Sequence, residues 1–217
     1  MTRAPSLCAV ILAAGESTRM GTDKALLAWP PLAPGVFSDK GTTFLAAAID
    51  VLGRFGDMVI VVGGKNSTKL APVVYANGAF LVENPAPDRG QFSSLQVGLK
   101  EVLNHGRDAA MVTLVDRPPV SAVTLEQLHT AFETAVNVRK WAVVPERGGK
   151  HGHPILIGRE MIEAFLKAPP EAIARDIEHQ NQQHIEYVPV ADPFATMNVD
   201  TPEQYAALTS AASPRTK

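Results

Sequence analysis

Short apolar runs alternate along this chain with segments whose apolar residues recur at helical spacing, and this alternation limits the possible folds more than any other feature. In the first half, β-rich runs occupy residues 7–13, 58–62, 80–82 and 109–115, a polar stretch follows the second run, and helical patterns occupy residues 44–55, 93–103 and 124–136. Such alternation predicts an α/β fold with a mostly parallel sheet and crossover helices.

The second half of the chain is less regular but continues the pattern. Residues 141–144, 154–157 and 185–190 are typical of strands, and residues 159–166 and 171–180 are typical of helices. Pro30, Pro31 and Pro34 interrupt the stretch from 27 to 42, which we expect to be a loop. We expect one domain over residues 1–209 and a flexible tail over 210–217.

The amino-acid composition limits the classes of ligand that the protein is expected to bind. The 217 residues are 46% hydrophobic and 19% charged, with a formal net charge of −2, so general attraction to nucleic acid is not expected and the ligand should be small. The only cysteine, Cys8, lies in the first apolar run, which favours core packing in a reducing compartment. That run holds about eight apolar residues, too few for a membrane span of roughly 20. We therefore expect a cytoplasmic protein without a membrane partner.

The first apolar run opens into a loop that carries two glycines and two cations. Small residues and backbone N–H groups after a strand can surround a triphosphate, and Arg19 and Lys24 would supply positive charge. Alternatively, Gly15 and Gly21 are ordinary turn residues and both cations are surface charges. The loop matches neither G-x-x-x-x-G-K-[ST] nor G-x-G-x-x-G, which disfavours a generic ATPase or dehydrogenase.

Ligands of open parallel sheets bind beyond the carboxyl ends of the strands, so residues just after each run are candidates. Besides the Gly15 loop, these are Gly63-Gly64, Asn84-Pro85, Asp116-Arg117-Pro118 and Asn198-Val199-Asp200. Asp116 at a strand mouth is suited to a hard cation such as Mg²⁺, or it caps the turn that follows. Asp200 precedes a predicted helix start, with Thr201 as N-cap and Gln204 in a capping box, so it could simply favour that helix end.

Residues 12–24 resemble the signature L-A-[AG]-G-x-S-x-R-M-G-x-x-K of the nucleotidyltransferases of the molybdenum-cofactor type, the MobA-like NTP transferases. The resemblance implies a Rossmann-like three-layer α/β/α sandwich of the nucleotide-diphospho-sugar transferase type. It also implies an enzyme that uses a nucleoside triphosphate and Mg²⁺ and transfers the nucleoside monophosphate to an acceptor, releasing pyrophosphate. The chain looks most like the molybdenum cofactor cytidylyltransferase (MocA-like) branch, because it reads Leu-Ala-Ala-Gly and carries a Gly-His-Pro element at 152–154.

Transferred residue by residue, the resemblance implies the following site. Arg19, Lys24 and Asp116 are catalytic, and Asp116 and Asp200 bind Mg²⁺, although Val115 stands where relatives usually carry glycine. His153 lies on the acceptor side, with Arg175 and Asp176 near it. Contacts to the nucleotide and acceptor come from Leu12, Ala13, Ala14, Gly15, Ser17, Asn84, Gly90, Ser93 and Ser94. The two serines equally fit helix N-caps.

The same resemblance implies CTP rather than GTP as the donor, a small phosphorylated acceptor such as molybdopterin, and a molybdenum hydroxylase or its maturation factor as a partner. Two alternatives stay open: another acceptor, such as a sugar phosphate, and a nucleotide-binding regulatory module without turnover. A dinucleotide oxidoreductase is disfavoured because its glycine fingerprint is missing. The Pro-rich segment 28–43 is several residues longer than in the family, which is consistent with an altered lid or acceptor.

Overall fold

The computed structural model describes residues 6–30, 42–169 and 171–212, and it is built around one mixed sheet. Along the sheet the strands follow the order β5-β4-β1-β6-β9-β7-β10, with β8 paired to β7. Their bounds are β1 Leu7–Leu12, β4 Met58–Gly63, β5 Phe80–Glu83, β6 Ala109–Leu114, β7 Ala142–Arg147, β8 Lys150–His151, β9 Ile155–Gly158 and β10 Ile185–Pro189. A separate two-stranded antiparallel ribbon joins β2 Ala28–Trp29 to β3 Thr42–Thr43.

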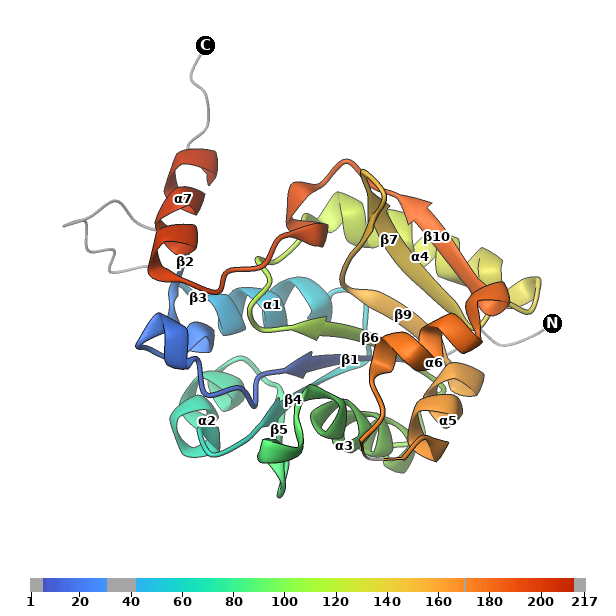
Figure 1. The fold of residues 1–217 in the computed structure, drawn as a ribbon, viewed down its shortest axis with the longest axis horizontal. Coiled ribbons are helices and arrows are strands. Elements are labelled where there is room, and N and C mark those ends of the chain that lie inside the picture. The colour runs from blue at the N-terminus through green and yellow to red at the C-terminus, as the bar shows by residue number, and fades with distance from the viewer. Residues whose placement is uncertain (1–5, 31–41, 170, 213–217) are drawn as a thin grey trace, which may run out of the picture.

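Helices cover both faces of the sheet, so the fold is the expected three-layer α/β/α sandwich (Figure 1). On one face lie α1 (Phe44–Gly53), α2 (Ser67–Ala76) and α4 (Ala122–Asn137). The other face is covered by α3 (Gln91–Asn104), α5 (Arg159–Lys167) and α6 (Ala174–Gln180). The last helix, α7 (Pro202–Ala212), packs through Leu208 and Tyr205 in a small separate cluster with Phe44 and Trp29.

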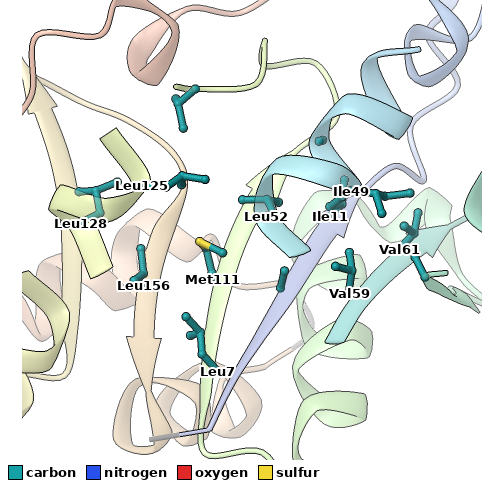
Figure 2. Close-up of a cluster of buried hydrophobic side chains, with 14 of the residues drawn as sticks. Leu7, Ile11, Ile49, Leu52, Val59, Val61, Met111, Leu125, Leu128 and Leu156 are labelled. Carbon is teal, nitrogen blue, oxygen red and sulfur yellow. The ribbon is translucent and has the colours of Figure 1, made fainter. Parts of the chain in front are cut away.

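Strand β1 shows why a buried parallel strand is apolar on both sides. Leu7, Ala9 and Ile11 enter the cluster with α1 and α4, whereas Cys8, Val10 and Leu12 enter the cluster with α3 and α5. Figure 2 shows Leu7 and Ile11 together with Leu52 and Leu125 in the first of these clusters. Burying each leucine, isoleucine or valine of the strand contributes about 1.5–3 kcal/mol to folding, which makes the continuous apolar run the basis of the sheet.

Chain order creates the crevice that positions the site. The chain runs from β1 to β4 and β5 on one side, and α3 then returns it to β6 on the other side of β1. Both β4 and β6 pair with β1 in parallel, so β1 and β6 end at the same edge, and this is where the strand order reverses (Figure 1). The β9 strand is antiparallel to β6 and begins the more irregular half of the sheet.

Several local predictions need correction. Residues 67–76 form α2, although they were treated as part of a polar stretch. The sequence did not predict this helix because only Leu70 and Val74 form its fully buried apolar stripe and because Pro72 lies inside it. The helix expected from 171 begins only at Ala174, and β8 and the β2–β3 ribbon were not predicted. Helix α7 continues to Ala212, so the predicted tail boundary at 210 lies within a helix. Residues 213–217, and 31–41 of the Pro-rich segment, lie outside the described residues.

Throughout the described ranges, we find no helix with the length and hydropathy needed to cross a membrane.

Candidate functional site

The loop between β1 and β2 is held by its own polar side chains. Ser17 and Gly21 have positive φ angles of 51° and 70°, which fold the loop back on itself around a short turn at Thr18–Met20. The Ser17 hydroxyl accepts a hydrogen bond from the backbone N–H of Lys24 (3.1 Å). Asp23 caps the next turn, Lys24–Leu26, by accepting from the N–H of Ala25 (3.1 Å). Lys24 is therefore fixed at its backbone by residues on both sides.

Two acidic residues from distant parts of the sequence meet this loop, and we call Asp116 and Asp200 the acid pair. Asp116 follows β6, and its backbone carbonyl accepts a hydrogen bond from the N–H of Val199 (2.8 Å), which brings the segment before α7 to the strand end. The Lys24 ammonium lies 2.6 Å from Asp200 Oδ1 and 3.8 Å from Asp116 Oδ2. Arg19 reaches the same Asp200 oxygen at 3.1 Å. The two cations predicted in this loop and the two acidic residues predicted elsewhere in the chain thus form one cluster.

Burial and charge act differently on the two carboxyl groups. Burial raises the pKa of Asp116, while the charges of Lys24 and Arg117 oppose that shift and the charge of Asp200 adds to it. The hydrogen bond from Lys24 lowers the pKa of Asp200. Asp200 also keeps its helix-capping surroundings, because its N–H and that of Thr201 both donate to Gln204 Oε1 and Gln204 N–H donates to Thr201 Oγ1. The predicted capping box is confirmed and does not occupy the Asp200 carboxylate.

Asp116 does not use its carboxylate to cap the following turn. Its Oδ1 atom is buried and has no hydrogen-bond partner in the described part of the chain. A buried carboxylate oxygen without a partner is costly unless a cation or a donor reaches it. The acid pair, with one uncommitted oxygen on Asp116, is therefore a suitable donor set for a hard divalent cation that also takes phosphate oxygens. Within the described residues there is no group of three or more His, Cys, Asp or Glu arranged for a metal.

The acid pair opens into a cavity of about 320 Å³ at the ends of β1 and β6. Ten residues predicted for the site line it: Leu12, Ala14, Gly15, Ser17, Arg19, Lys24, Gly90, Ser94, Asp116 and Asp200. Pro87 and Gln91 also line the cavity and were not predicted. The cavity combines backbone groups of the loop, two cations and two carboxylates, which is the set of groups that a polyphosphate with its metal needs.

The close approach of the loop after β1 explains the second glycine of the Gly63-Gly64 pair at the end of β4. A Cβ atom on Gly64 would lie 2.8 Å from the carbonyl oxygen of Ala14 and 3.2 Å from the Ala14 and Pro87 Cβ atoms. The absence of a side chain at Gly64 thus lets the loop after β1 pack against the end of β4. The methyl group of Ala14 faces this contact, although Ala14 also lines the cavity.

Three predicted contact residues lie behind the cavity wall. Ala13, Asn84 and Ser93 are buried. Among the described residues, these three line neither the 320 Å³ cavity nor a larger cavity of about 1130 Å³ that adjoins it. The Asn84 amide donates to Ser93 Oγ (2.8 Å) and Ser94 Oγ (3.0 Å), and its carbonyl accepts from Ala86 N–H (2.9 Å). Asn84 therefore holds the wall residue Ser94 in place.

The alternative interpretation of Ser93 and Ser94 as N-caps is wrong. Helix α3 begins at Gln91, and Gly90, with a φ angle of 93°, is the N-cap residue. The Ser93 hydroxyl instead donates toward the carbonyls of Gly90 (2.7 Å) and Ala86 (3.3 Å). The positive φ angle explains why glycine is suitable at position 90.

A second cavity of about 1130 Å³ adjoins the first and shares five wall residues with it: Leu12, Gly90, Gln91, Leu114 and Asp116. His153 and Arg175, which the resemblance assigns to the acceptor side, line this cavity, and Asp176 does not belong to its described lining. Arg117 lines it as well, and its Nη1 donates to the carbonyl of Ala195 (3.3 Å). Because Asp116 borders both spaces, groups bound in the two cavities would meet beside its carboxylate.

The Gly-His-Pro element has a structural role in this second cavity. Gly152 packs directly on the carbonyl of Ala195, so closely that an added Cβ would overlap the oxygen and lie 2.7 Å from the carbonyl carbon. His153 N–H donates to the same carbonyl (2.8 Å), and His153 Nδ1 lies 3.3 Å from the Val112 carbonyl oxygen. Burial, supported by the charge of Arg117, lowers the pKa of His153 to about 3, so its imidazole is neutral at physiological pH.

Sequence reasoning missed Gln91 and Asn66, and it gave Arg117 no role although that residue stood in one of the candidate strand-end segments. Arg117 directly follows Asp116, and Asn66 follows the Gly63-Gly64 pair by two residues. Gln91 carried no signal, because a glutamine at the start of an amphipathic helix is indistinguishable from a solvated residue.

Comparison with known proteins identifies the group to which the chain belongs. The model of the MobA-like NTP transferase domain family matches residues 9–188. A probable molybdenum cofactor guanylyltransferase of Rhodopirellula baltica is 32% identical over 128 residues, which cover 59% of this chain and 56% of that protein. A protein with the same name from Mycobacterium avium is 30% identical over 152 residues, covering 70% of this chain and 68% of that protein.

A solved structure supports the fold. The crystal structure of Rv0371c from Mycobacterium tuberculosis H37Rv superimposes with a TM-score of 0.72, at 24% identity, and covers 94% of this chain and 98% of that one. At this identity the likeness concerns the fold alone. The aligned part spans little more than half of the Rhodopirellula relative, whereas the family model covers most of the chain described here. The chain therefore belongs to the family of proteins with a MobA-like NTP transferase domain.

Proposed function

We propose that this protein is a Mg²⁺-dependent nucleotidyltransferase that moves a nucleoside monophosphate from a nucleoside triphosphate to a small phosphorylated acceptor and releases pyrophosphate. One observation carries the proposal. Arg19, Lys24 and the acid pair form a single cluster in the wall of the smaller cavity, and Asp116 also borders the larger one. In this proposal the nucleotide occupies the smaller cavity and the acceptor occupies the larger one.

The chemistry requires little from the protein beyond positioning and charge. An ionised acceptor oxygen forms a bond to the α-phosphorus while the bond to the bridging oxygen breaks, and pyrophosphate leaves with that electron pair. A phosphate acceptor is already ionised at neutral pH, so no general base is needed. Arg19 and Lys24 offset the negative charge that develops on the phosphate oxygens. Asp116 and Asp200 would hold Mg²⁺, which when bound neutralises charge on the triphosphate.

Lys24 has two roles in this proposal. In the structure its ammonium pairs with the acid pair and thereby holds two carboxylates in one cluster. Its side chain is only 11% exposed, so its charge is weakly screened by solvent. With nucleotide and metal present, we propose that this ammonium turns to the α-phosphate, because the metal then supplies the charge that the carboxylates need.

The acceptor and the base each have a specific argument. Both curated relatives are named molybdenum cofactor guanylyltransferases, which favours molybdopterin as the acceptor and GTP as the donor. The Leu-Ala-Ala-Gly sequence and the Gly-His-Pro element favour CTP instead. The packing of the Ala14 methyl toward Gly64 weakens the first of these two arguments, because a methyl group in that contact does not by itself select a base.

Two measurements on the purified chain test the proposal. Thermal unfolding is recorded with GTP, CTP, ATP or UTP and Mg²⁺, because a ligand of the folded state raises the apparent melting temperature. Pyrophosphate release is then followed with molybdopterin as the acceptor, with and without EDTA. We expect release with GTP or CTP that EDTA abolishes. A melting shift without release would exclude molybdopterin as the acceptor, and neither effect with any nucleotide would contradict the proposal.

A further inference from the structure

Asn66 connects three parts of the site, although it is not among the described residues that line the 320 Å³ cavity or the 1130 Å³ cavity. Its side-chain amide donates to the carbonyl oxygen of Ala13 (3.0 Å) and to Asp23 Oδ2 (2.7 Å). Its side-chain carbonyl accepts from the N–H of Gly64 (3.1 Å). One side chain therefore joins the end of β4, the end of β1 and the loop that carries Lys24.

The Asn66 side chain makes these hydrogen bonds and not the capping bond that is usual for an asparagine at a helix N-cap. Asn66 is the N-cap residue of α2, where asparagine commonly accepts a hydrogen bond from the first turn of the helix. Among the described contacts its side chain makes no such capping bond. The amide is directed to the loop after β1 instead, so the needs of α2 do not explain the residue.

The bond to Asp23 leads directly to Lys24. One Asp23 oxygen accepts from Asn66 and the other from the N–H of Ala25, so the carboxylate is fixed at both ends. Asp23 is the cap of the turn that begins with Lys24, and it therefore sets the direction in which the Lys24 side chain leaves the backbone. From there the Lys24 ammonium reaches Asp200 at 2.6 Å.

We propose that Asn66 is a positioning residue: through Asp23 it holds Lys24 in the direction that serves the transferred phosphate. The inference rests on the proposed nucleotidyl transfer. In this inference Asn66 acts through Asp23, and its effect is to keep the Lys24 turn attached to the sheet. Because misplacing a catalytic group by about 1 Å can cost on the order of 100-fold in rate, losing this attachment should reduce turnover strongly.

The test separates positioning from helix stability. Asn66→Ser keeps a good N-cap residue for α2 but is too short to reach Asp23. Asn66→Asp places a carboxylate against Asp23, and the double variant Asn66→Asp/Asp23→Asn restores one donor and one acceptor with exchanged roles. Asn77→Ala is the matched control, because Asn77 lies at the other end of α2 and its side-chain amide donates only to the Val73 carbonyl among the contacts described.

Each variant is assayed for pyrophosphate release, with kcat and nucleotide KM determined separately. We expect Asn66→Ser to lower kcat on the order of 10- to 100-fold with a smaller change in KM, and Asn77→Ala to resemble the wild type. Asn66→Asp should be worse than Asn66→Ser, and the double variant should recover part of the loss. Wild-type kcat in Asn66→Ser, or a double variant no better than Asn66→Asp, would overturn the inference.

A second readout is independent of turnover. Lysine acetylation by acetic anhydride is measured peptide by peptide, with the exposed Lys100 as the internal reference. Lys24, at 8% exposure, should react slowly in the wild type and in Asn77→Ala, and at least several times faster in Asn66→Ser. An unchanged Lys24 reactivity would refute the positioning role. If the wild type releases no pyrophosphate with any nucleotide, the proposed function fails, whereas this labelling still tests whether Asn66 holds Lys24.

Discussion

Replacing His153 by glutamine should remove a pH dependence from the stability of this protein. The imidazole has an ordinary pKa of 6.5 in the unfolded chain and about 3 in the folded state, so below pH 6.5 the unfolded chain binds a proton that the folded protein excludes. The contribution is therefore complete above pH 6.5 and is lost as the pH falls toward 3. At about 1.4 kcal/mol per unit, the full loss is about 5 kcal/mol, and the loss between pH 6.5 and 5 is about 2 kcal/mol.

Urea unfolding of the wild type and of His153→Gln at pH 7.5, 6 and 5 measures this effect. Glutamine can still donate to the Val112 carbonyl, so the comparison mainly removes the titratable group. The stability of the wild type relative to the variant should decrease by about 2 kcal/mol between pH 7.5 and 5, because the other titrating groups cancel in the difference. A difference that stays constant over this pH range would show that His153 binds its proton as readily in the folded protein as in the unfolded chain, and this would refute the reasoning.

Four further outcomes are expected. Lys24→Met should reduce pyrophosphate release on the order of 100- to 1000-fold while the circular dichroism spectrum stays unchanged, and release above a tenth of the wild-type rate would contradict its role. Gly152→Ala should lower the unfolding free energy by about 3 kcal/mol, because the new methyl group meets the backbone of Ala195, whereas Gly53→Ala at the end of α1 should change it by less than about 1 kcal/mol. Asn84→Ala should lower it by about 2–3 kcal/mol, measured by urea unfolding, since two buried hydrogen bonds and one partly buried hydrogen bond disappear. Asp200→Asn should weaken Mn²⁺ binding at least about tenfold by electron paramagnetic resonance in the presence of nucleotide, and equal affinity would exclude this carboxylate as a ligand.

Much of the fold could be predicted because its signals are local. The apolar runs of β1, β4 and β6 and the stripes of α3 and α4 each report their own burial, and their order implies a parallel sheet. The α2 helix was missed because its buried stripe consists of few residues and is interrupted by Pro72. The β2–β3 ribbon gave no signal, since two-residue strands are defined by their pairing and not by a pattern.

The site was predictable to the extent that it lies at strand ends. Asp116 and Asp200 were found because one follows an apolar run and the other precedes a helix start, yet only the bond from Val199 to the Asp116 carbonyl shows how they meet. Asn84 was assigned to the ligand, whereas the structure uses it behind the wall, because a sequence cannot show on which side of a loop a buried amide points. Asn66 was not predicted because its sequence context likewise does not show in which direction its amide points.

The central claim is that the acid pair holds a metal beside a triphosphate in the smaller cavity. Isothermal titration calorimetry with GTP and with CTP, each at saturating Mg²⁺, tests this most directly in the wild type and in the double variant Asp116→Ala/Asp200→Ala. The account predicts binding of at least one of these nucleotides to the wild type, a strong decrease without Mg²⁺, and a comparable decrease in the double variant. Binding of equal affinity in the double variant, or none in the wild type, would contradict it.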